Sequence, residues 1–576
     1  MNKLDINGFY LFTSFLEPVE IKTLGISSKH VYNNCMNFMT YLYSEHGCNE
    51  SYYKMTTAKW IVDKCNWNIL SDCINKNLTI NSIVFNDEFN IPIKSFGNCT
   101  NLQQITFGDK FNQSVEALAN CTNLQQITFG YKFNKPIKAL ANCANLRQIN
   151  FNFWFNQPIE ALANCTNLQQ ITFGEQFNKS IEALANCTNL QQITFGGEFN
   201  QPIEVITSHT NLQQITFGVD FNKSIEALAN CTTLQQITFG GEFNRPIEVL
   251  ANCITLQQIT FGWLFNQSIE VLANCTNLQQ IKFDQDFDQP VEALSNCTNL
   301  QQITFGWLFN QPIEALASCT NLQQITFGWW FNQSIEVLTK CTHLHQITFG
   351  WKFNQPIEAI AYCTTLQQIT FGWCFNQPIE ALANCTSLRQ ITFGSEFNRS
   401  IEALSKCTNL QQITFGVEFN RPIEALASCA NLQQITFGSR FDQSIGALAD
   451  CTNLQQITLG KMFNQPIAVL AKCTNLLTIM FDPGSQFNQP IKALAKCTTL
   501  QQIIFGEEFD QSIEALAKCT ALQQITFTRY SLFNQSVEAL ASCTNLQQIT
   551  FGYRFNRSIK SLQTNLPNLK ISKHCI

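Results

Sequence analysis

The chain of 576 residues has few charged side chains, 13% of the total, and no cluster of basic residues. Its formal net charge is −6 and its pI is about 5.7. Nucleic acids and anionic membrane surfaces attract basic patches, so this balance argues against both as partners. No apolar run approaches the roughly 20 residues of a membrane-spanning helix. The N-terminal residues also lack a cleavage site typical of a signal peptide.

Recognisable catalytic motifs are absent too. The sequence has six histidines, scattered along the chain, and it contains no nucleophile elbow, phosphate-binding loop or zinc-protease motif. A glutamate recurs at one repeat position, as at Glu160, but a row of like charges is more typical of a solvated face than of a paired acid and base. We therefore predict no enzyme, no cofactor and no metal site.

Cysteine is abundant, with 26 residues, but no C-x-x-C pair accompanies them. Most lie at one repeat position, from Cys99 to Cys543, which His209 occupies once. One interpretation is a secreted, disulfide-linked array. The other is a ladder of small buried thiols, which we favour because side chains in register point the same way, whereas disulfides need specific vectors. Sequons such as Asn164-Cys165-Thr166 would crowd glycans on adjacent coils, which also favours a reducing compartment.

The segment 155–176 (FNQPIEALANCTNLQQITFGEQ) is repeated along nearly the whole chain. Its first Phe recurs at Phe89 and then every 22 residues to Phe463, and again at Phe487, Phe509, Phe533 and Phe555. Such a period indicates a solenoid, in which no unit buries its apolar face alone. Function is therefore expected on a surface and not in a deep pocket.

Within the unit, Leu168, Ile171 and Phe173 have leucine-rich-repeat spacing. The alternation in 171–173 predicts a strand whose Ile and Phe point inward. Residues 159–165 (IEALANC) have apolar side chains in steps of three, which suits one or two helical turns preceded by Pro or Ser. The predicted fold is an α/β, leucine-rich-repeat-like solenoid of about 22 coils with a parallel sheet on one face.

The repeat also predicts the core. Two ladders of Phe, flanked by Leu and Ile, are expected inside, each buried side chain contributing roughly 1.5–3 kcal/mol. The Asn after the opening Phe becomes Asp only at Asp288, Asp442 and Asp510. Because a carboxylate keeps the acceptor oxygen of Asn, we expect this side chain to bond the backbone of the next coil.

The N-terminal segment differs from the repeats and reads as two short amphipathic helices separated by a Pro turn. It resembles an F-box, which implies adaptor-binding residues Leu4, Phe9, Phe12, Phe15, Leu16, Pro18, Ile21 and Leu24. The alternative is a plain helical cap on the first coil. The expected organisation is an F-box-like helical motif (1–45), a mixed and helical linker and cap (46–79), repeats (80–565) and a C-terminal cap (566–576).

The repeats resemble the FNIP family, a relative of the leucine-rich repeats, whose tetrapeptide stands at residues 89–92. Proteins that pair an F-box-like start with such repeats are similar to substrate-recognition subunits of cullin ubiquitin ligases. The resemblance implies a Skp-type adaptor as one partner, an unknown protein substrate as another, and a cytoplasmic location, or the host cytoplasm for a viral protein. The alternatives are a repeat scaffold without a ubiquitin role and a secreted recognition protein.

Two surfaces are candidates for partner binding. Outward strand residues such as Gln169, Gln170 and Thr172 recur almost unchanged, and stacked amides can simply bond one another. The two residues after the strand Gly vary, and in the middle of the chain they include Trp. Exposed aromatic patches often mark partner sites, although neighbouring indoles can also simply cover each other. The predicted partner-binding residues are Trp263, Trp307, Trp329, Trp330, Trp351, Trp373 and His345.

Overall fold

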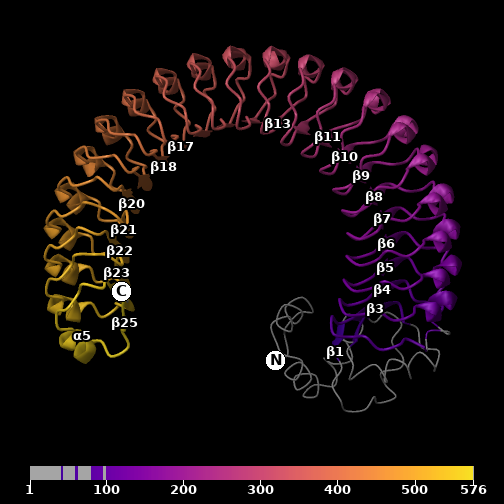
Figure 1. The fold of residues 1–576 in the computed structure, drawn as a ribbon, viewed down its shortest axis with the longest axis horizontal. Coiled ribbons are helices and arrows are strands. Elements are labelled where there is room, and N and C mark those ends of the chain that lie inside the picture. The colour runs from indigo at the N-terminus through magenta and orange to yellow at the C-terminus, as the bar shows by residue number, and fades with distance from the viewer. Residues whose placement is uncertain (1–39, 43–58, 63–79, 95, 97–98, 575–576) are drawn as a thin grey trace, which may run out of the picture. The chain divides into compact units, whose positions relative to one another are not determined.

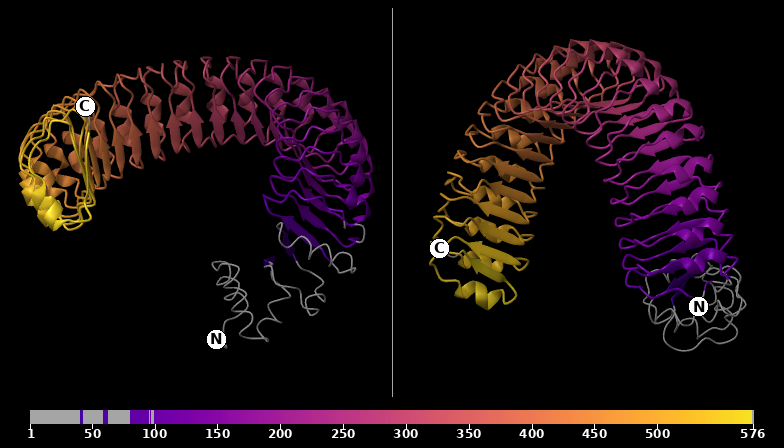
Figure 2. Two further views of the ribbon diagram at one scale, coloured as in Figure 1. Left: turned by 60° about the horizontal axis from the view of Figure 1, so that its bottom comes forward. Right: turned by 45° about the vertical axis from the view of Figure 1, so that its right-hand side comes forward.

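The computed structural model describes residues 40–42, 59–62, 80–94, 96 and 99–574. It divides into two compact units, Met1–Asn277 and Leu278–Ile576. Each described coil consists of a short strand, a tight turn and a return segment that contains a short helix. Strands follow one side of each unit and the helices follow the other (Figure 1 and Figure 2).

The strands of the first unit are β1 (Thr40–Leu42), β2 (Lys59–Val62), β3 (Ser82–Phe85), β4 (Gln104–Thr106), β5 (Gln126–Thr128), β6 (Gln148–Asn150), β7 (Gln170–Thr172), β8 (Gln192–Thr194), β9 (Gln214–Thr216), β10 (Gln236–Thr238) and β11 (Gln258–Thr260). Its 3-10 helices are η3 (Glu116–Asn120), η4 (Lys138–Asn142), η5 (Glu160–Asn164), η6 (Glu182–Asn186), η7 (Glu204–Ser208), η8 (Glu226–Asn230), η9 (Glu248–Asn252) and η10 (Glu270–Asn274).

The strands of the second unit are β12 (Gln280–Lys282), β13 (Gln302–Thr304), β14 (Gln324–Thr326), β15 (Gln346–Thr348), β16 (Gln368–Thr370), β17 (Gln390–Thr392), β18 (Gln412–Thr414), β19 (Gln434–Thr436), β20 (Gln456–Leu459), β21 (Thr478–Phe481), β22 (Gln502–Phe505), β23 (Gln524–Phe527), β24 (Gln548–Phe551) and β25 (Lys570–Lys573). Its helices are η11 (Glu292–Asn296), η12 (Glu314–Ser318), η13 (Glu336–Lys340), η14 (Glu358–Tyr362), η15 (Glu380–Asn384), η16 (Glu402–Lys406), η17 (Glu424–Ser428), η18 (Gly446–Asp450), η19 (Ala468–Lys472), η20 (Lys492–Lys496), η21 (Glu514–Lys518), η22 (Glu538–Ser542) and the α-helix α5 (Lys560–Asn565).

Neighbouring strands pair in parallel with equivalent residues side by side, as Ile149 with Ile171. The predicted solenoid with a parallel sheet is confirmed. In β7 the central Ile is buried while Gln170 and Thr172 are partly exposed, because alternate side chains of a strand point to opposite faces. A register of one repeat per coil therefore places identical side chains on top of one another.

The helical segment is a 3-10 helix and begins one residue later than expected, at Glu160 instead of Ile159. Ile159 has φ −118° and ψ 19°, and its side chain is buried in the core. This residue therefore belongs to the core and precedes the helix. In coils with Ser two residues before the helix, the hydroxyl caps the first turn, as Ser114 Oγ accepts a hydrogen bond from Glu116 N at 3.3 Å.

The two predicted Phe ladders form the core. Phe129 and Phe133 of one coil have ring centroids 4.0 Å apart, and Phe129 lies 5.5 Å from Phe107 of the preceding coil with nearly parallel rings. Both Phe129 and Phe133 are fully buried. Each ring thus contacts aromatic neighbours within its own coil and in the coils on either side, which couples adjacent repeats.

The Asn ladder is confirmed. Asn134 Oδ1 accepts a hydrogen bond from the Asn156 backbone N–H of the next coil at 3.1 Å. The bond survives where Asp replaces Asn, because Asp442 Oδ1 accepts from Asn464 N at 2.9 Å. Each coil is therefore fastened to the next by a side-chain acceptor on the return segment.

The predicted thiol ladder is also confirmed for the described cysteines, which are free and, apart from Cys374, buried. Cys165 Sγ lies 3.6 Å from the Cys143 carbonyl oxygen of the preceding coil. At the one repeat position where His209 replaces the cysteine, His209 Nε2 lies 3.1 Å from the Leu184 carbonyl oxygen. Burial lowers the pKa of His209. The disulfide-linked alternative does not hold for these residues.

Two segments break the repeat period, 482–486 and 528–532, and both form loops between the strand and the opening Phe. Each is anchored by a buried serine: Ser485 Oγ accepts from Phe487 N at 3.2 Å and Ser531 Oγ accepts from Phe533 N at 3.3 Å. Thr528 of the second loop donates to the Pro483 carbonyl of the first at 3.3 Å. The two insertions thus contact each other across the coil that separates them.

Strands replace helix at two places in the segments 1–45 and 46–79: β1 lies in the first, expected to be helical, and β2 in the second, expected to be mixed and helical. β1 and β2 pair in parallel with each other, and β2 pairs with β3. An open strand edge can be satisfied by further strands, which explains why the sheet extends past the first repeat. Near the C-terminus, the expected cap contains β25, which pairs with β24, and Leu562 and Leu566 are buried. The expected F-box residues lie outside the described residues.

Candidate functional site

The turn that follows each strand places the variable side chains. In the coil of β14, the Phe331 N–H donates to the Gly328 carbonyl across the turn at 3.4 Å, and Trp330 N donates to the Trp307 carbonyl of the preceding coil at 3.0 Å. A Cβ on Gly328 would lie 1.6 Å from the Gly306 carbonyl oxygen. Glycine is therefore required where adjacent turns approach most closely, and this approach brings the variable side chains into register.

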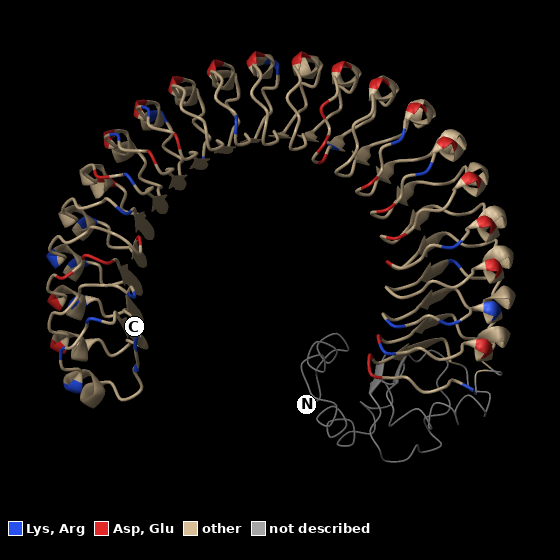
Figure 3. Ribbon diagram, viewed as in Figure 1, with Lys and Arg blue, Asp and Glu red and all other residues tan. Residues whose placement is uncertain are grey.

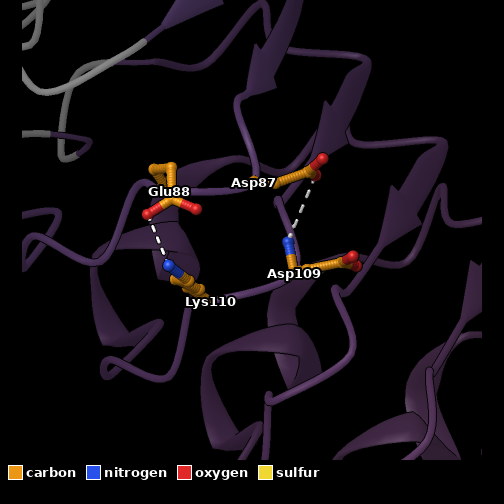
Figure 4. Close-up of polar contacts among 4 residues, drawn as sticks. All are labelled: Asp87, Glu88, Asp109 and Lys110. Carbon is orange, nitrogen blue, oxygen red and sulfur yellow. Dashed lines mark hydrogen bonds and ion pairs between the residues drawn. The ribbon is translucent and has the colours of Figure 1, made fainter.

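The first unit shows what this register does with charged residues (Figure 4). Asp109 N donates to Asp87 Oδ1 at 3.4 Å, and Lys110 Nζ pairs with Glu88 at 2.5 Å. Both contacts join residues one repeat apart. Along the edge formed by the turns, residues one repeat apart therefore contact each other directly.

Four tryptophans in the second unit form one stack, which we call the Trp ladder: Trp307, Trp329, Trp351 and Trp373. The indole centroids of Trp329 and Trp351 are 4.4 Å apart and nearly parallel, and Trp351 and Trp373 have the same spacing. Trp307 and Trp329 are 5.0 Å apart and tilted by 32°. Despite the stacking, Trp307 remains 46% exposed, so the ladder is also an open aromatic surface.

The second position of the same turns widens this surface. Leu308 is 44% exposed and Trp330 is 47% exposed. The ammonium of Lys352 lies 5.4 Å from the centroid of the Trp330 ring, a distance at which a cation is attracted to the ring face. Cys374 is partly exposed, and its pKa is raised by burial and by the nearby Glu396 charge.

Trp263, in the first unit, has a different environment. A Cβ on Gly241 would lie 2.5 Å from Trp263 Cζ2, so the indole rests on the glycine of the preceding turn. It stays 39% exposed. Within the second unit the structure brings Trp307, Trp329, Trp330, Trp351 and Trp373 together.

His345 lies directly before β15, whereas Trp351 follows the same strand, so the two are separated by roughly 20 Å of extended chain. His345 is partly buried and borders the glutamine face, the surface of outward strand residues such as Gln169 and Gln170. It does not border the Trp ladder. His343 takes the place of an Asn, with its Nδ1 3.1 Å from the Thr320 carbonyl oxygen, as Asn321 Nδ2 donates to the Thr298 carbonyl. Its role in the described structure is to join coils.

The glutamine face forms amide–amide bonds at only two pairs among the described residues. Gln368 Nε2 donates to Gln390 Oε1 at 3.2 Å, and Gln502 donates likewise to Gln524 at 3.3 Å. The interpretation in which stacked amides bond one another therefore holds at these two pairs and not along the whole described face. The side chains of adjacent strands are aligned, but most are not oriented to bond one another.

Two features of the surface were not predicted from the sequence. Outward strand positions become apolar at Met480 and Ile504, and with Leu459 and Pro483 they line a hollow of about 450 Å³. In the first unit, Tyr131 stacks on Phe153 at 4.8 Å, and Trp154 beside them is 46% exposed. In both cases the sequence departs from the repeat, at outward strand positions or in the turns, and this departure could have indicated the surface.

The helical side carries the recurrent glutamates, which are exposed, as at Glu160. Figure 3 shows acidic residues along the helices of each unit, in agreement with a solvated face. Within the described ranges, no three metal-ligating side chains form a group that could hold an ion. None of the helices in that part of the chain has the length and apolar character to cross a membrane.

A family model described as "BspA type Leucine rich repeat region" matches most of the chain. The matched residues are 67–181, 158–269, 249–363, 335–421, 380–489, 422–512 and 490–574. The expected leucine-rich-repeat class is confirmed, and this match names neither an F-box nor an FNIP repeat. No curated protein matches the chain significantly.

Solved structures with the same architecture include CroV588, described as a circular leucine-rich-repeat protein, with a TM-score of 0.63 and 28% identity over 86% of this chain and 77% of that one. TLR13 in complex with ssRNA13 has a TM-score of 0.56 and 12% identity over 90% of this chain and 82% of that one. Internalin InlF of Listeria monocytogenes has a TM-score of 0.45 and 19% identity over 57% and 89%.

Proposed function

Since the chain belongs to the BspA type leucine-rich-repeat family, we propose that it is a non-enzymatic protein-interaction scaffold whose partner docks on the Trp ladder. Repeat solenoids present extended surfaces on rigidly stacked coils, and such surfaces are what these folds use for binding. The repeat fold supports the general role as a scaffold. The exposed indoles at the edge formed by the turns support the location of the binding site.

The observation that carries the location is the stack of exposed indoles. A soluble protein leaves few large aromatic side chains in one exposed patch, and a contiguous patch is typical of a binding site. Tryptophan is also enriched among residues that dominate binding energy. Stacking holds these indoles in one arrangement before a partner arrives, so little side-chain entropy is lost on binding.

The test is selection of peptides from a random display library on the full chain, followed by measurement of each peptide against Trp329→Ala. We expect peptides whose affinity falls at least about ten-fold, because a central aromatic anchor contributes more than about 1.4 kcal/mol. Tyr362→Ala is the matched control, because Tyr362 is a 59% exposed aromatic on the helical side. Peptides that bind both variants as tightly as the original chain would refute the location.

A finer proposal concerns the N-terminal segment. The F-box resemblance of residues 4–27, together with repeats resembling the FNIP family, supports a role as the substrate-recognition subunit of a cullin-type ubiquitin ligase in the cytoplasm. In that role Leu4, Phe9, Phe12, Phe15, Leu16, Pro18, Ile21 and Leu24 contact a Skp-type adaptor. The Trp ladder then holds the substrate, and catalysis belongs to the recruited ligase.

This finer proposal is tested by binding of the full chain to a purified Skp-type adaptor, with Phe15→Ala plus Leu16→Ala as the disrupting variant. Binding that the double substitution abolishes, while Trp329→Ala leaves it intact, is the expected result. A folded chain that does not bind the adaptor would leave a scaffold without this ubiquitin role.

A further inference from the structure

Carboxylates flank the Trp ladder at both ends. On one side the turn after β12 carries Asp284 and Asp286, and on the other the turns after β17 and β18 carry Glu396 and Glu418. Within this stretch of turns the basic residue is Lys352, at the second position beside Trp351. The aromatic surface is thus bounded by negative charge, which matches the net charge of −6 of the whole chain.

Trp330, the chain neighbour of Trp329 in the Trp ladder, already accepts a cation on its ring face. Lys352 extends over Trp330 with its ammonium 5.4 Å from the ring centroid, although solvent is available to it. The negative potential of an indole face attracts cations by about 0.5–1 kcal/mol at exposed sites. A guanidinium is more weakly hydrated than an ammonium and is planar, so it stacks on such a face more readily.

The end of the ladder adds a shaped site. A hollow of about 520 Å³ is lined by residues that include Trp373, Asn376, Ser395, Glu396, Val417 and Glu418. Glu418 is held by Arg440, with Nη1 2.6 Å from its Oε2, whereas the Glu396 side chain is exposed. An aromatic face and a carboxylate that border the same hollow are the two groups that a guanidinium binds at once.

We propose that the partner is a protein segment rich in arginine, with one guanidinium seated in the hollow between Trp373 and Glu396 and another on the Trp330 face that Lys352 covers. This inference rests on the proposed function and names the chemistry of the partner at the same surface. Anionic partners are repelled by the same carboxylates.

The probes are three synthetic peptides of one length and one apolar frame that carry arginine, the neutral isostere citrulline, or glutamate at the same positions. Binding to the full chain is measured by titration calorimetry at low and at moderate salt. We expect the arginine peptide to bind about ten-fold more tightly than the citrulline peptide, with affinity that weakens as salt is added. We expect the glutamate peptide not to bind.

Two substitutions on the surface give opposite signs. Glu396→Gln weakens the arginine peptide by about three- to ten-fold because the carboxylate is lost. Lys352→Met tightens it, because a competing cation leaves the Trp330 face. Glu402→Gln is the matched control: it removes an exposed carboxylate on η16 at the helical side and leaves the affinity unchanged.

The outcomes separate the two proposals. Equal affinity for the arginine and citrulline peptides, both lost in Trp329→Ala, would overturn the basic partner and keep the Trp ladder as a binding site. Tighter binding of the glutamate peptide, or no binding of the arginine peptide, also overturns the inference. The library selection with Trp329→Ala then decides separately whether the ladder binds any peptide.

Discussion

At the scale of single residues, burial governs the thiol ladder. Cys165 lies in a column of thiols that face backbone carbonyls, and desolvation, together with the neighbouring Cys187 and Cys143, raises its pKa to about 12 from the ordinary 9.0. A thiolate is the reactive form of cysteine. The ladder is therefore chemically quiet at neutral pH, and its residues serve packing.

The raised pKa values predict alkaline unfolding. Between pH 9 and about 12 an unfolded cysteine loses its proton while Cys165 keeps it, so the unfolded chain binds fewer protons and stability falls as pH rises. The stabilising contribution is complete below pH 9 and is lost toward pH 12, at up to about 1.4 kcal/mol per thiol and pH unit. Thiolate absorbance and circular dichroism measured together should change in one step.

The control for this prediction is a variant in which the cysteines outside the thiol ladder are replaced by Ser: Cys35, Cys48, Cys65, Cys73, Cys374 and Cys575. Its steep alkaline transition should persist. A thiolate signal that grows near pH 9 while the circular dichroism of the folded chain is unchanged would show that the ladder titrates normally and is not desolvated.

At the scale of the element, the turn glycine decides how close two coils come. A Cβ on Gly350 would lie 1.8 Å from the Gly328 carbonyl oxygen and 2.9 Å from Trp329 Cα. Backbone atoms cannot move aside as the end of a flexible side chain can. The close approach also aligns Trp329 and Trp351, so the Trp ladder depends on this glycine column.

We therefore expect Gly350→Ala to destabilise the chain by about 1–3 kcal/mol through forced backbone shifts and to weaken the Trp329–Trp351 exciton signal in near-ultraviolet circular dichroism. Gly446→Ala is the matched control, since the new Cβ meets only Ser444 Oγ at 3.3 Å at the start of η18. That substitution should change stability by less than about 1 kcal/mol. Equal effects of the two variants would contradict the role of coil spacing.

The elements were predictable where the repeat dictates them. The period, the Ile171–Phe173 alternation and the Asn-to-Asp pattern at Asp442 follow from stacking identical units, so strands, core ladders and the Asn ladder could be read from the sequence. The start of the helix at Glu160 could not be predicted, because burial of the Ile159 side chain competes with the helix propensity of that segment. The separation of His345 from the Trp ladder depends on which end of the strand each residue occupies.

Departures from the repeat were harder to interpret than the repeat itself. Met480 and Ile504 are unremarkable as single substitutions, and only adjacency across strands turns them into the lining of one hollow. The Trp ladder was predicted from its spacing, but the sequence did not show whether indoles would cover one another or remain open. Both happen, since Trp329 stacks on two neighbours and is still 36% exposed.

At the scale of the whole molecule, contacts between coils are made chiefly with immediate neighbours, so stability should be transmitted locally. Phe437 lies 5.6 Å from Phe415 of the preceding coil and 3.9 Å from Phe441 of its own coil, while the next coil has Leu459 at the equivalent position. In a solenoid with nearest-neighbour coupling, a lost side chain weakens its own coil and the adjacent ones, but not distant coils.

Phe437→Ala should cost about 3–5 kcal/mol, the usual loss for a buried Phe, and should raise amide hydrogen exchange in β18, β19 and β20 while β13 and β24 keep their protection. Phe437→Leu is the matched control, because Leu459 already fills the same position in the next coil, and it should cost less and leave exchange nearly unchanged. Hydrogen-exchange mass spectrometry resolves these strands. Uniform loss of protection from β12 to β25 after Phe437→Ala would instead mean that the second unit unfolds as one cooperative body.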